Sequence, residues 1–254
     1  MSAWQPVDCH AHSTFSDGAL TVAEVVAIAA ERGVVPSVTD HITGDVASAV
    51  SSLERLDEYL SALEQQPVLR GGEFCYHDAL WRIVPPGTVR RFTHRVGSLH
   101  AIQLGDGSWL HAWSRTMPES LQAHEYMEAH IATLERFAAE MPVDILAHPT
   151  LVALAFRKLP SEELFTEAHE LRMTRALAAA GIAFEVSNRY RPHERLVRRA
   201  IDAGCRISLG SDGHSAAQVA DVQWPLELTR ALGYPDGELY DPRVHGSRTQ
   251  AAAA

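Results

Sequence analysis

Histidines and carboxylates occur in this sequence in short groups, and nearly every group follows an apolar stretch. The first group is Asp8-Cys9-His10-Ala11-His12. Residues two apart in an extended chain point to the same side, so His10 and His12 can bind one metal ion together. The later groups add seven further candidate ligands, which are Asp17, His41, Glu73, His100, His148, Asp212 and His214.

This mixture of donors indicates the kind of ion and the kind of chemistry. Imidazoles with carboxylates suit Zn, Mn or Fe, whereas Mg and Ca prefer oxygen ligands alone. Six histidines and three carboxylates exceed the about four to six donors around one ion, so we expect about two or three divalent ions and a bridging carboxylate. Neighbouring ions can generate a hydroxide at neutral pH, neutralise phosphate charge and stabilise a leaving oxygen.

Each motif taken alone has a simpler interpretation. His10 and His12 are also compatible with a packed pair on one strand, and Asp17-Gly18 is typical of a turn. Glu73 alone is compatible with a surface carboxylate, but Gly71-Gly72 before it indicates a close approach of the backbone to another group. The complete series, and no single motif, favours the metal centre.

Apolar stretches and helical patterns alternate along the chain. The predicted strands are Val7–His10, Val34–Thr39, Pro67–Glu73, Val143–Ala147, Ile182–Val186 and Arg206–Leu209. The predicted helices are Thr21–Arg32, Asp45–Gln65, Ser120–Glu140, Ser161–Ala180, His193–Ala203 and Val222–Leu232. Less regular β-like pieces lie around Trp81–Val84, Val96–Gln103 and Trp109–Ala112.

This alternation predicts parallel βαβ units, and about seven strands favour an α/β barrel over an open sheet. The carboxyl ends of barrel strands meet on one face, where active sites lie. The candidate ligands follow those ends. Among the local signals, Thr21 with Glu24 three residues later predicts a capping box, and Gly181 predicts a helix end.

Length and composition fit one domain covering residues 1–254, with a loosely ordered tail over about 244–254. The formal net charge of −10 argues against nucleic acid and anionic membranes as partners. Cys9, Cys75 and Cys205 are widely spaced and odd in number, so no disulfide framework is expected. Neither a signal peptide nor an apolar run of membrane-spanning length is visible, and we expect a cytoplasmic protein.

The ordered series HxH, SDG, TDH, a strand-terminal Glu, GSxH, a later His and SDxH resembles the PHP superfamily, named for its polymerase and histidinol-phosphatase members. The match extends from Val7 to about Val222. It implies a distorted (β/α)7 barrel resembling a TIM barrel. It also implies three metal sites: His10, His12, Glu73 and Asp212 at the first, Glu73, His100 and His148 at the second, and Asp17, His41 and His214 at the third.

Three stretches are most similar to the histidinol-phosphatase branch: Val96–His100, Glu185–Asn188 ahead of a basic pair, and Leu196–His214. The chain departs from that branch at Gly213, where Ala is usual, and at Pro149-Thr150 after His148. These departures leave the metal ligands intact, but they affect the substrate assignment.

The resemblance implies a phosphatase that hydrolyses a small phosphate monoester, similar to histidinol phosphate, by means of a metal-bound hydroxide. Arg189 and Arg191 are the predicted substrate-phosphate clamp, because guanidinium groups bind phosphate oxygens in a bidentate way. Asp17, Glu73 and His214 are the candidate catalytic residues, and Asp17, His214 or a metal-bound water could be the general acid.

Two alternatives remain at this stage. One is a phosphoesterase acting on nucleotides or short oligonucleotides, and the other is a non-catalytic PHP module. Of the remaining histidines, His77 and His94 are candidates for the mouth of the site, and the others are interpreted as surface or structural residues. The sequence indicates neither the oligomeric state nor the native metal.

Overall fold

The computed structural model describes residues 4–46 and 48–248, and it is a mixed α/β structure built on parallel strands. Strands β1, β2 and β4 form one parallel sheet, and β11, β10, β9, β6, β5 and β3 form a second one in that order. Their bounds are Val7–Asp8 (β1), Val35–Val38 (β2), His41–Ile42 (β3), Leu69–Arg70 (β4), Glu73–Cys75 (β5), Val96–Ser98 (β6), Ile145–Leu146 (β9), Ala183–Ser187 (β10) and Ile207–Gly210 (β11).

The two sheets are connected at both edges. On one side β2 leads into β3 through Thr39-Asp40, and β4 leads into β5 through Gly71-Gly72. On the other side the segment after β1 lies beside β11: the Cys9 backbone N–H donates to the Leu209 carbonyl at 2.9 Å. The strands therefore end close to one another, and the donor-bearing loops follow those ends.

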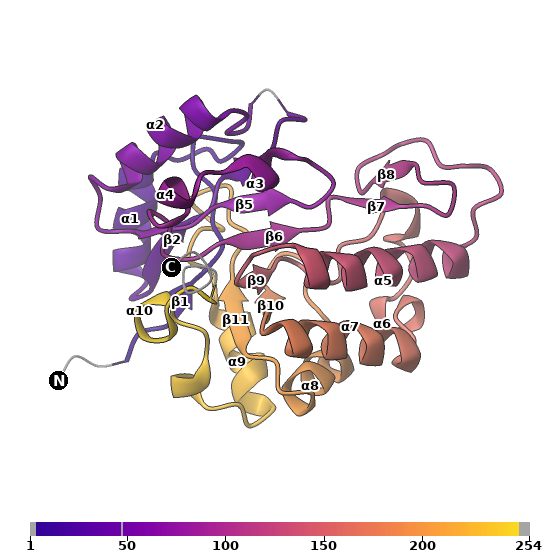
Figure 1. Cartoon of the computed structure of the whole chain (residues 1–254). Helices are drawn as coiled ribbons and strands as arrows, with labels where there is room; N and C mark the ends of the chain where they lie inside the picture. The colour runs from indigo at the N-terminus through magenta and orange to yellow at the C-terminus, as the bar shows by residue number, and fades with distance from the viewer. Residues whose placement is uncertain (1–3, 47, 249–254) are drawn as a thin grey trace.

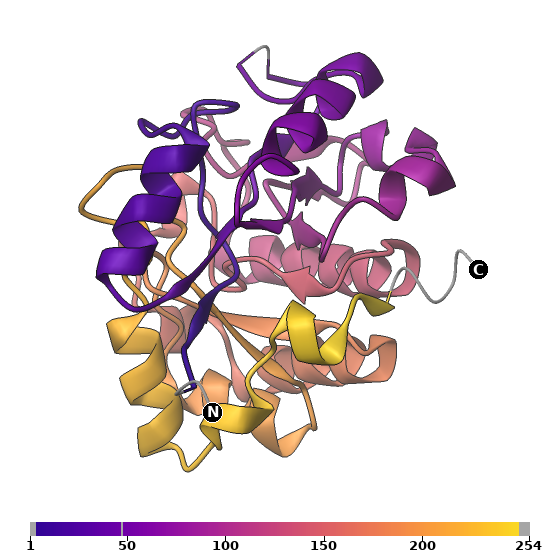
Figure 2. The same cartoon turned by 90° about the vertical axis from the view of Figure 1, so that its left-hand side faces the viewer.

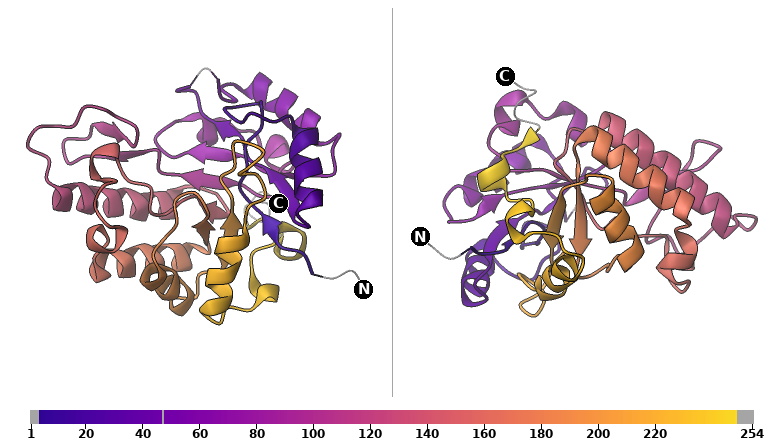
Figure 3. Two further views of the ribbon diagram at one scale, coloured as in Figure 1. Left: turned by 180° about the vertical axis from the view of Figure 1, so that it is seen from behind. Right: turned by 90° about the horizontal axis from the view of Figure 1, so that it is seen from below.

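Helices surround the strands, as Figures 1 to 3 show. The longer ones are Val22–Glu31 (α1), Leu53–Leu63 (α2), Ala123–Glu140 (α5), Glu167–Ala180 (α7), Glu194–Asp202 (α8) and Gln223–Ala231 (α9). The short ones are Leu80–Ile83 (α3), Pro86–Val89 (α4), Ser161–Leu164 (α6) and Pro242–His245 (α10). A membrane crossing requires more length and apolar character than any helix of the described chain has.

An antiparallel hairpin interrupts the alternation. Strands β7 (Ala101–Gln103) and β8 (Trp109–His111) pair with each other, and Figure 1 shows the hairpin beside α5, away from the other strands. It brings His111 of β8 toward the segment after β5, because the ring of His111 packs edge-to-face on His77 with centroids 4.9 Å apart.

The structure shows both of the helix-end signals that the sequence predicts. The hydroxyl of Thr21 accepts the backbone N–H of Glu24, and the Glu24 carboxylate accepts the backbone N–H of Thr21 at 2.8 Å, which is the predicted capping box. Gly181 ends α7 with φ +66°, a left-handed conformation that glycine adopts without a steric cost.

Three predicted elements differ in the structure. The helix predicted over Asp45–Gln65 begins only at Leu53, because Ser52 caps it and the preceding residues form a loop. Trp81–Val84 lies in and after helix α3 and is not β-like, since the indole of Trp81 is buried and donates to the Tyr76 carbonyl. The helix predicted over Ser161–Ala180 is two helices, because Thr166 caps a new one.

The segment predicted to be a loose tail is partly held by hydrogen bonds to the rest of the protein. Ser247 donates to the carboxylate of Asp144 at 2.8 Å, and Arg248 donates to the Val143 carbonyl at 2.6 Å. Its composition did not indicate these contacts. Residues 249–254 of the predicted tail lie outside the described residues.

Candidate metal centre

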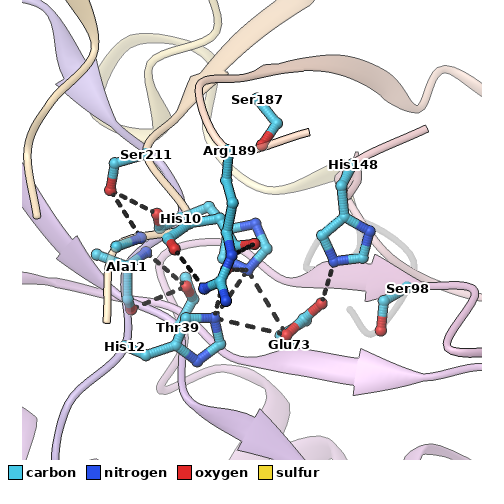
Figure 4. A network of polar contacts seen from close by, with 12 residues as sticks. His10, Ala11, His12, Thr39, Glu73, Ser98, His148, Ser187, Arg189 and Ser211 are labelled. Carbon is cyan, nitrogen blue, oxygen red and sulfur yellow. Dashed lines mark hydrogen bonds and ion pairs between the residues drawn. The ribbon is translucent and has the colours of Figure 1, made fainter. Parts of the chain in front are cut away.

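The structure brings all nine predicted ligands together, in the short parallel strands or in the loops that follow them. His10 and His12 follow β1, His41 begins β3, and Glu73 begins β5. The others follow β6, β9 and β11, and they are His100, His148, Asp212 and His214, with Asp17 in the loop after His12. Figure 4 shows His10, His12 and His148 gathered around Glu73.

Glu73 lies at the middle of this group and is completely buried. Its Oε1 is 3.1 Å from Nε2 of His100 and 3.0 Å from Nε2 of His148. Its Oε2 is 2.6 Å from Nδ1 of His41 and 3.5 Å from Nε2 of His10. One carboxylate thus faces imidazoles from four strand ends, which is the position of a bridging ligand.

Asp212 and Asp17 face the remaining imidazoles. The Oδ1 atom of Asp212 is 3.3 Å from Nε2 of His12. The Oδ1 atom of Asp17 is 3.2 Å from Nε2 of His214 and 3.5 Å from Nε2 of His41. The side chain of Asp17 is 50% exposed, so this part of the group is its open side.

The donor set fits divalent ions. Around a tetrahedral Zn²⁺ with bonds of about 2.0–2.1 Å, donor atoms are roughly 3.3 Å apart, close to the separations given above. Nε2 of His10 and Nε2 of His12 face each other at 3.1 Å. In the neutral His10 ring with its proton on Nδ1 toward Glu185, Nε2 presents a lone pair, which is the arrangement of a metal-ligating histidine.

Unpartnered buried atoms point to the same conclusion. Among the described residues, Nδ1 of His41 and Oε2 of Glu73 have no hydrogen-bond partner, although they approach within 2.6 Å. Buried polar atoms normally have partners. A cation bound by both atoms on one side would satisfy them, and it would also draw them slightly apart.

The carboxylates and imidazoles of this group shift one another's pKa values. Burial works against the charge of Glu73, but His100, His41 and His10 outweigh it and hold the pKa of Glu73 well below its usual range. Burial also opposes a charge on His41, yet Glu73 and Asp17 raise its pKa to about 10. The pKa of His12 falls to about 3 through burial and the neighbouring His41.

Glu185, in β10, orients two of the candidate ligands. Its Oε1 is 2.8 Å from Nδ1 of His10, and its Oε2 accepts the backbone N–H of His148 at 2.5 Å. A Cβ atom at Gly210 of the neighbouring strand would overlap this carboxylate. Glycine at position 210 therefore makes room for the buried acid.

Two further buried aspartates connect the ligand-bearing loops. Asp8 accepts the backbone N–H and the hydroxyl of Ser211, at 2.8 and 2.6 Å, and burial raises the pKa of Asp8 to about 6. Asp40 accepts the backbone N–H and the hydroxyl of Ser13, at 2.9 and 2.6 Å. These bonds fix the loops that contain Asp212 and His12.

Two candidate ligands have unusual backbone conformations. His148 has φ +29° and Asp212 has φ +48°, in a region that residues other than glycine rarely adopt. Such conformations are found at functional sites, where the surrounding structure holds them. At Asp212, the backbone N–H donates to the His10 carbonyl at 2.8 Å.

The two predicted clamp arginines lie in different surroundings. Arg189 reaches the metal centre: its Nε is 3.8 Å from Oδ2 of Asp212, and one terminal nitrogen is 2.6 Å from Nδ1 of His214. Figure 4 shows its side chain extending toward the candidate ligands. Arg191 donates to Asn188 and lies over the ring of Trp224, 4.8 Å from its centroid. Its described contacts involve none of the nine ligands.

A cavity of about 330 Å³ opens beside the centre. Asp17, His41 and His100 line its inner end, and the ring of Trp113 packs on His100. His77 lines this cavity, whereas His94 is buried in the interior, with its Nε2 3.1 Å from the Cys9 carbonyl oxygen.

Sequence reasoning did not give roles to Asp8, Asp40 and Glu185. Asp8 and Asp40 stand beside predicted ligands in the motifs themselves, and that adjacency was an available signal. Glu185 is the one acid in the predicted strand 182–186. A charge inside an apolar strand indicates a buried polar contact, since an unpaired buried charge is costly.

Comparisons with known proteins place the arrangement of strands and helices among solved α/β folds. No family model matches the sequence, and the search of curated proteins finds no match. The comparison with solved structures does find matches, and their sequence identity is low. At such identities a likeness establishes the fold.

Two of the matching structures are histidinol phosphatases by name. The histidinol phosphate phosphatase of Lactococcus lactis, solved with zinc, L-histidinol and phosphate, gives a TM-score of 0.66 at 18% identity over 93% of this chain and 95% of its own. A protein of Listeria monocytogenes assigned as a histidinol phosphatase gives 0.68 at 16% identity over 85% of this chain and 97% of its own. The chain thus shares its fold with these two structures.

Proposed function

We propose that this protein is a metal-dependent phosphatase that hydrolyses a small phosphate monoester of the histidinol phosphate type. The observation that carries the proposal is the convergence of six imidazoles and three carboxylates, with buried Glu73 facing five of the imidazoles. The zinc, L-histidinol and phosphate named for the Lactococcus lactis structure support the choice of metal and substrate class.

The residues divide into three sets of ligands. His10, His12 and Asp212 would hold one ion, with Glu73 as a shared ligand. His100 and His148 would hold a second ion, again together with Glu73, and Asp17, His41 and His214 would hold a third one. Bound ions of this kind activate water and neutralise phosphate charge.

The chain's own residues would orient the substrate and supply the proton. Arg189 stands beside the open side of the centre, where its guanidinium could bind two phosphate oxygens. Asp17 and His214 are 3.2 Å apart at the same side, next to the cavity that would receive the alcohol portion. Whichever of the two does not ligate an ion could hold the proton that the leaving oxygen requires.

We also propose that the two parallel sheets form one distorted (β/α)7 barrel. The β2–β3 and β4–β5 continuities and the bonds between β1 and β11 support this arrangement. It would explain why donors from positions 10 to 214 share one rim.

Two other functions have specific weaknesses. A nucleotide or oligonucleotide phosphoesterase has to attract a polyanion, which the net charge of −10 disfavours. A non-catalytic module has no need of a complete ligand set, and every one of the nine positions has a metal-binding side chain.

One assay separates these functions. The zinc- or manganese-loaded protein is tested on histidinol phosphate, a nucleoside bisphosphate and a short oligonucleotide, with phosphate release as the readout. We expect release from histidinol phosphate that a chelator and Glu73→Ala both abolish. Preference for the nucleotide substrates would favour the second function, and less than about one ion per chain without hydrolysis would favour the module.

A further inference from the structure

A second group of metal-binding side chains lies at the mouth of the cavity, outside the nine ligands. Asp45 belongs to the loop after β3, His77 follows β5, and His111 is in β8. One potential ligand atom from each lies within 4.8 Å of those of the other two. Three segments far apart in the sequence thus bring two imidazoles and a carboxylate to one place.

The group has definite contacts. Nε2 of His77 is 2.5 Å from Oδ2 of Asp45, and the ring of His111 packs edge-to-face on that of His77. Asp78 accepts the backbone N–H of Gly44 and that of Leu80. The bond from Gly44 ties the loop of Asp45 to the segment of His77, and the bond from Leu80 fixes Asp78 within that segment.

An ordinary ion pair explains only part of this arrangement. Burial lowers the pKa of His77, and the neighbouring Asp45 does not reverse that shift, so the imidazole is in the neutral form that ligates metals. Its Nδ1 is buried and has no hydrogen-bond partner among the described residues. An Asp45–His77 pair also does not involve the imidazole of His111, which packs edge-to-face on the ring of His77.

We propose that Asp45, His77 and His111 form a peripheral binding site for a divalent cation of the zinc class. Two histidines and one carboxylate are a donor set of three-ligand zinc sites, which keep a fourth position for water or substrate. The two imidazoles in this donor set favour zinc over calcium or magnesium, which prefer oxygen ligands.

The location gives the site a consequence for ligand entry. Asp45, His77 and His111 line the same cavity as Asp17, His41 and His100. A cation there adds positive charge at the entrance of a protein whose net charge is −10. It would raise the local concentration of anionic ligands in the cavity.

Counting bound zinc tests the site directly. Zinc-equilibrated protein is freed of excess ion, and metal per chain is measured by mass spectrometry for the unmodified protein, His77→Gln/His111→Gln, His111→Gln alone and His124→Gln. His124 is an exposed histidine of α5 and serves as the control. We expect both cavity variants to lose about one ion per chain and the control to lose none.

A second measurement keeps the result independent of the main centre and of folding. Zinc-edge anomalous scattering from crystals of the Glu73→Ala protein should retain a peak between Asp45, His77 and His111. An unchanged zinc count in both cavity variants, or no peak at that place, would overturn the peripheral site. Loss of the inner ions alone would instead concern the proposed catalytic centre.

Discussion

The carboxylate of Glu185 contacts His10 through one oxygen and the backbone of His148 through the other, at 2.8 and 2.5 Å. These contacts join three of the parallel strands, since the residues belong to β10 and to the segments after β1 and β9. The bond to Nδ1 directs Nε2 of His10 toward Glu73 and His12. Glu185 is therefore a positioning residue for the metal centre.

Glu185→Gln should weaken metal binding without removing a ligand. An amide offers one acceptor where the carboxylate offers two, so either His10 or the His148 N–H loses its partner. Replacing an outer partner of this kind lowers metal affinity by about 10- to 100-fold. Competition with a chromophoric chelator measures the affinity.

The matched control for this variant is Glu170→Gln. Glu170 is also buried, but it pairs with Arg195, Arg199 and His193 and not with a candidate ligand. The Glu170→Gln variant should have a lower free energy of unfolding and an unchanged metal affinity. Equal affinities in Glu185→Gln and the unmodified protein would show that His10 needs no such partner.

Gly210→Ala should destabilise the protein because its Cβ would overlap the Glu185 carboxylate and contact Cβ of His10 at 3.0 Å. Overpacking of a buried site costs about 1–3 kcal/mol. Urea unfolding of the metal-free protein measures this loss. Gly105→Ala, where a Cβ meets no atom within 4 Å, is the control, and similar free energies of unfolding in the two variants would contradict the prediction.

The sequence predicted most of the candidate site because its information is local. Nearly every ligand follows an apolar stretch, and parallel strands bring their carboxyl ends to one edge, so the groups around His10 and His214 are expected to meet without any knowledge of the packing. The Gly71-Gly72 pair also behaves as predicted, since a Cβ at either position would overlap Thr39 or Ile42.

What the sequence did not predict depends on tertiary contacts. Arg191 looks equivalent to Arg189 in the sequence, but its guanidinium packs on the ring of Trp224 in α9. Convergence of Asp45 and His111 depends on the path of a loop and a hairpin. Helical spacing in 45–65 could not show that Ser52 caps the helix, because the apolar pattern continues before it.

Stability should fall at acidic pH in part because of His130, which is buried in α5. Burial lowers its pKa from 6.5 to about 4, so below pH 6.5 the unfolded chain binds the proton and the folded one does not. This contribution to stability is complete above pH 6.5 and is lost as the pH falls toward 4. Between pH 7.5 and 5.0 the loss is about 2 kcal/mol.

The test compares His130→Leu with the unmodified protein. Other titrating groups affect both proteins, so the difference between their unfolding free energies at pH 7.5 and 5.0, measured with chelator present, isolates His130. We expect the variant to lose about 2 kcal/mol less on acidification. His124→Leu, at an exposed position, should behave as the unmodified protein, and an identical pH dependence in all three would refute the assignment.

Arg189→Ala should weaken phosphate binding and spare the ions. The guanidinium lies beside Asp212 and His214, so its removal takes positive charge away from the metal ligands and does not oppose cation binding. Hydrogen bonds to charged groups contribute roughly 1.5–3 kcal/mol, and we therefore expect kcat/KM and the affinity for inorganic phosphate to fall by about 10- to 100-fold. Arg189→Lys should recover part of the loss, because an ammonium keeps the charge without the bidentate geometry. Arg191→Ala is the control, since its side chain lies on Trp224, and an equal loss in the two alanine variants at unchanged zinc content would assign the clamp to both arginines.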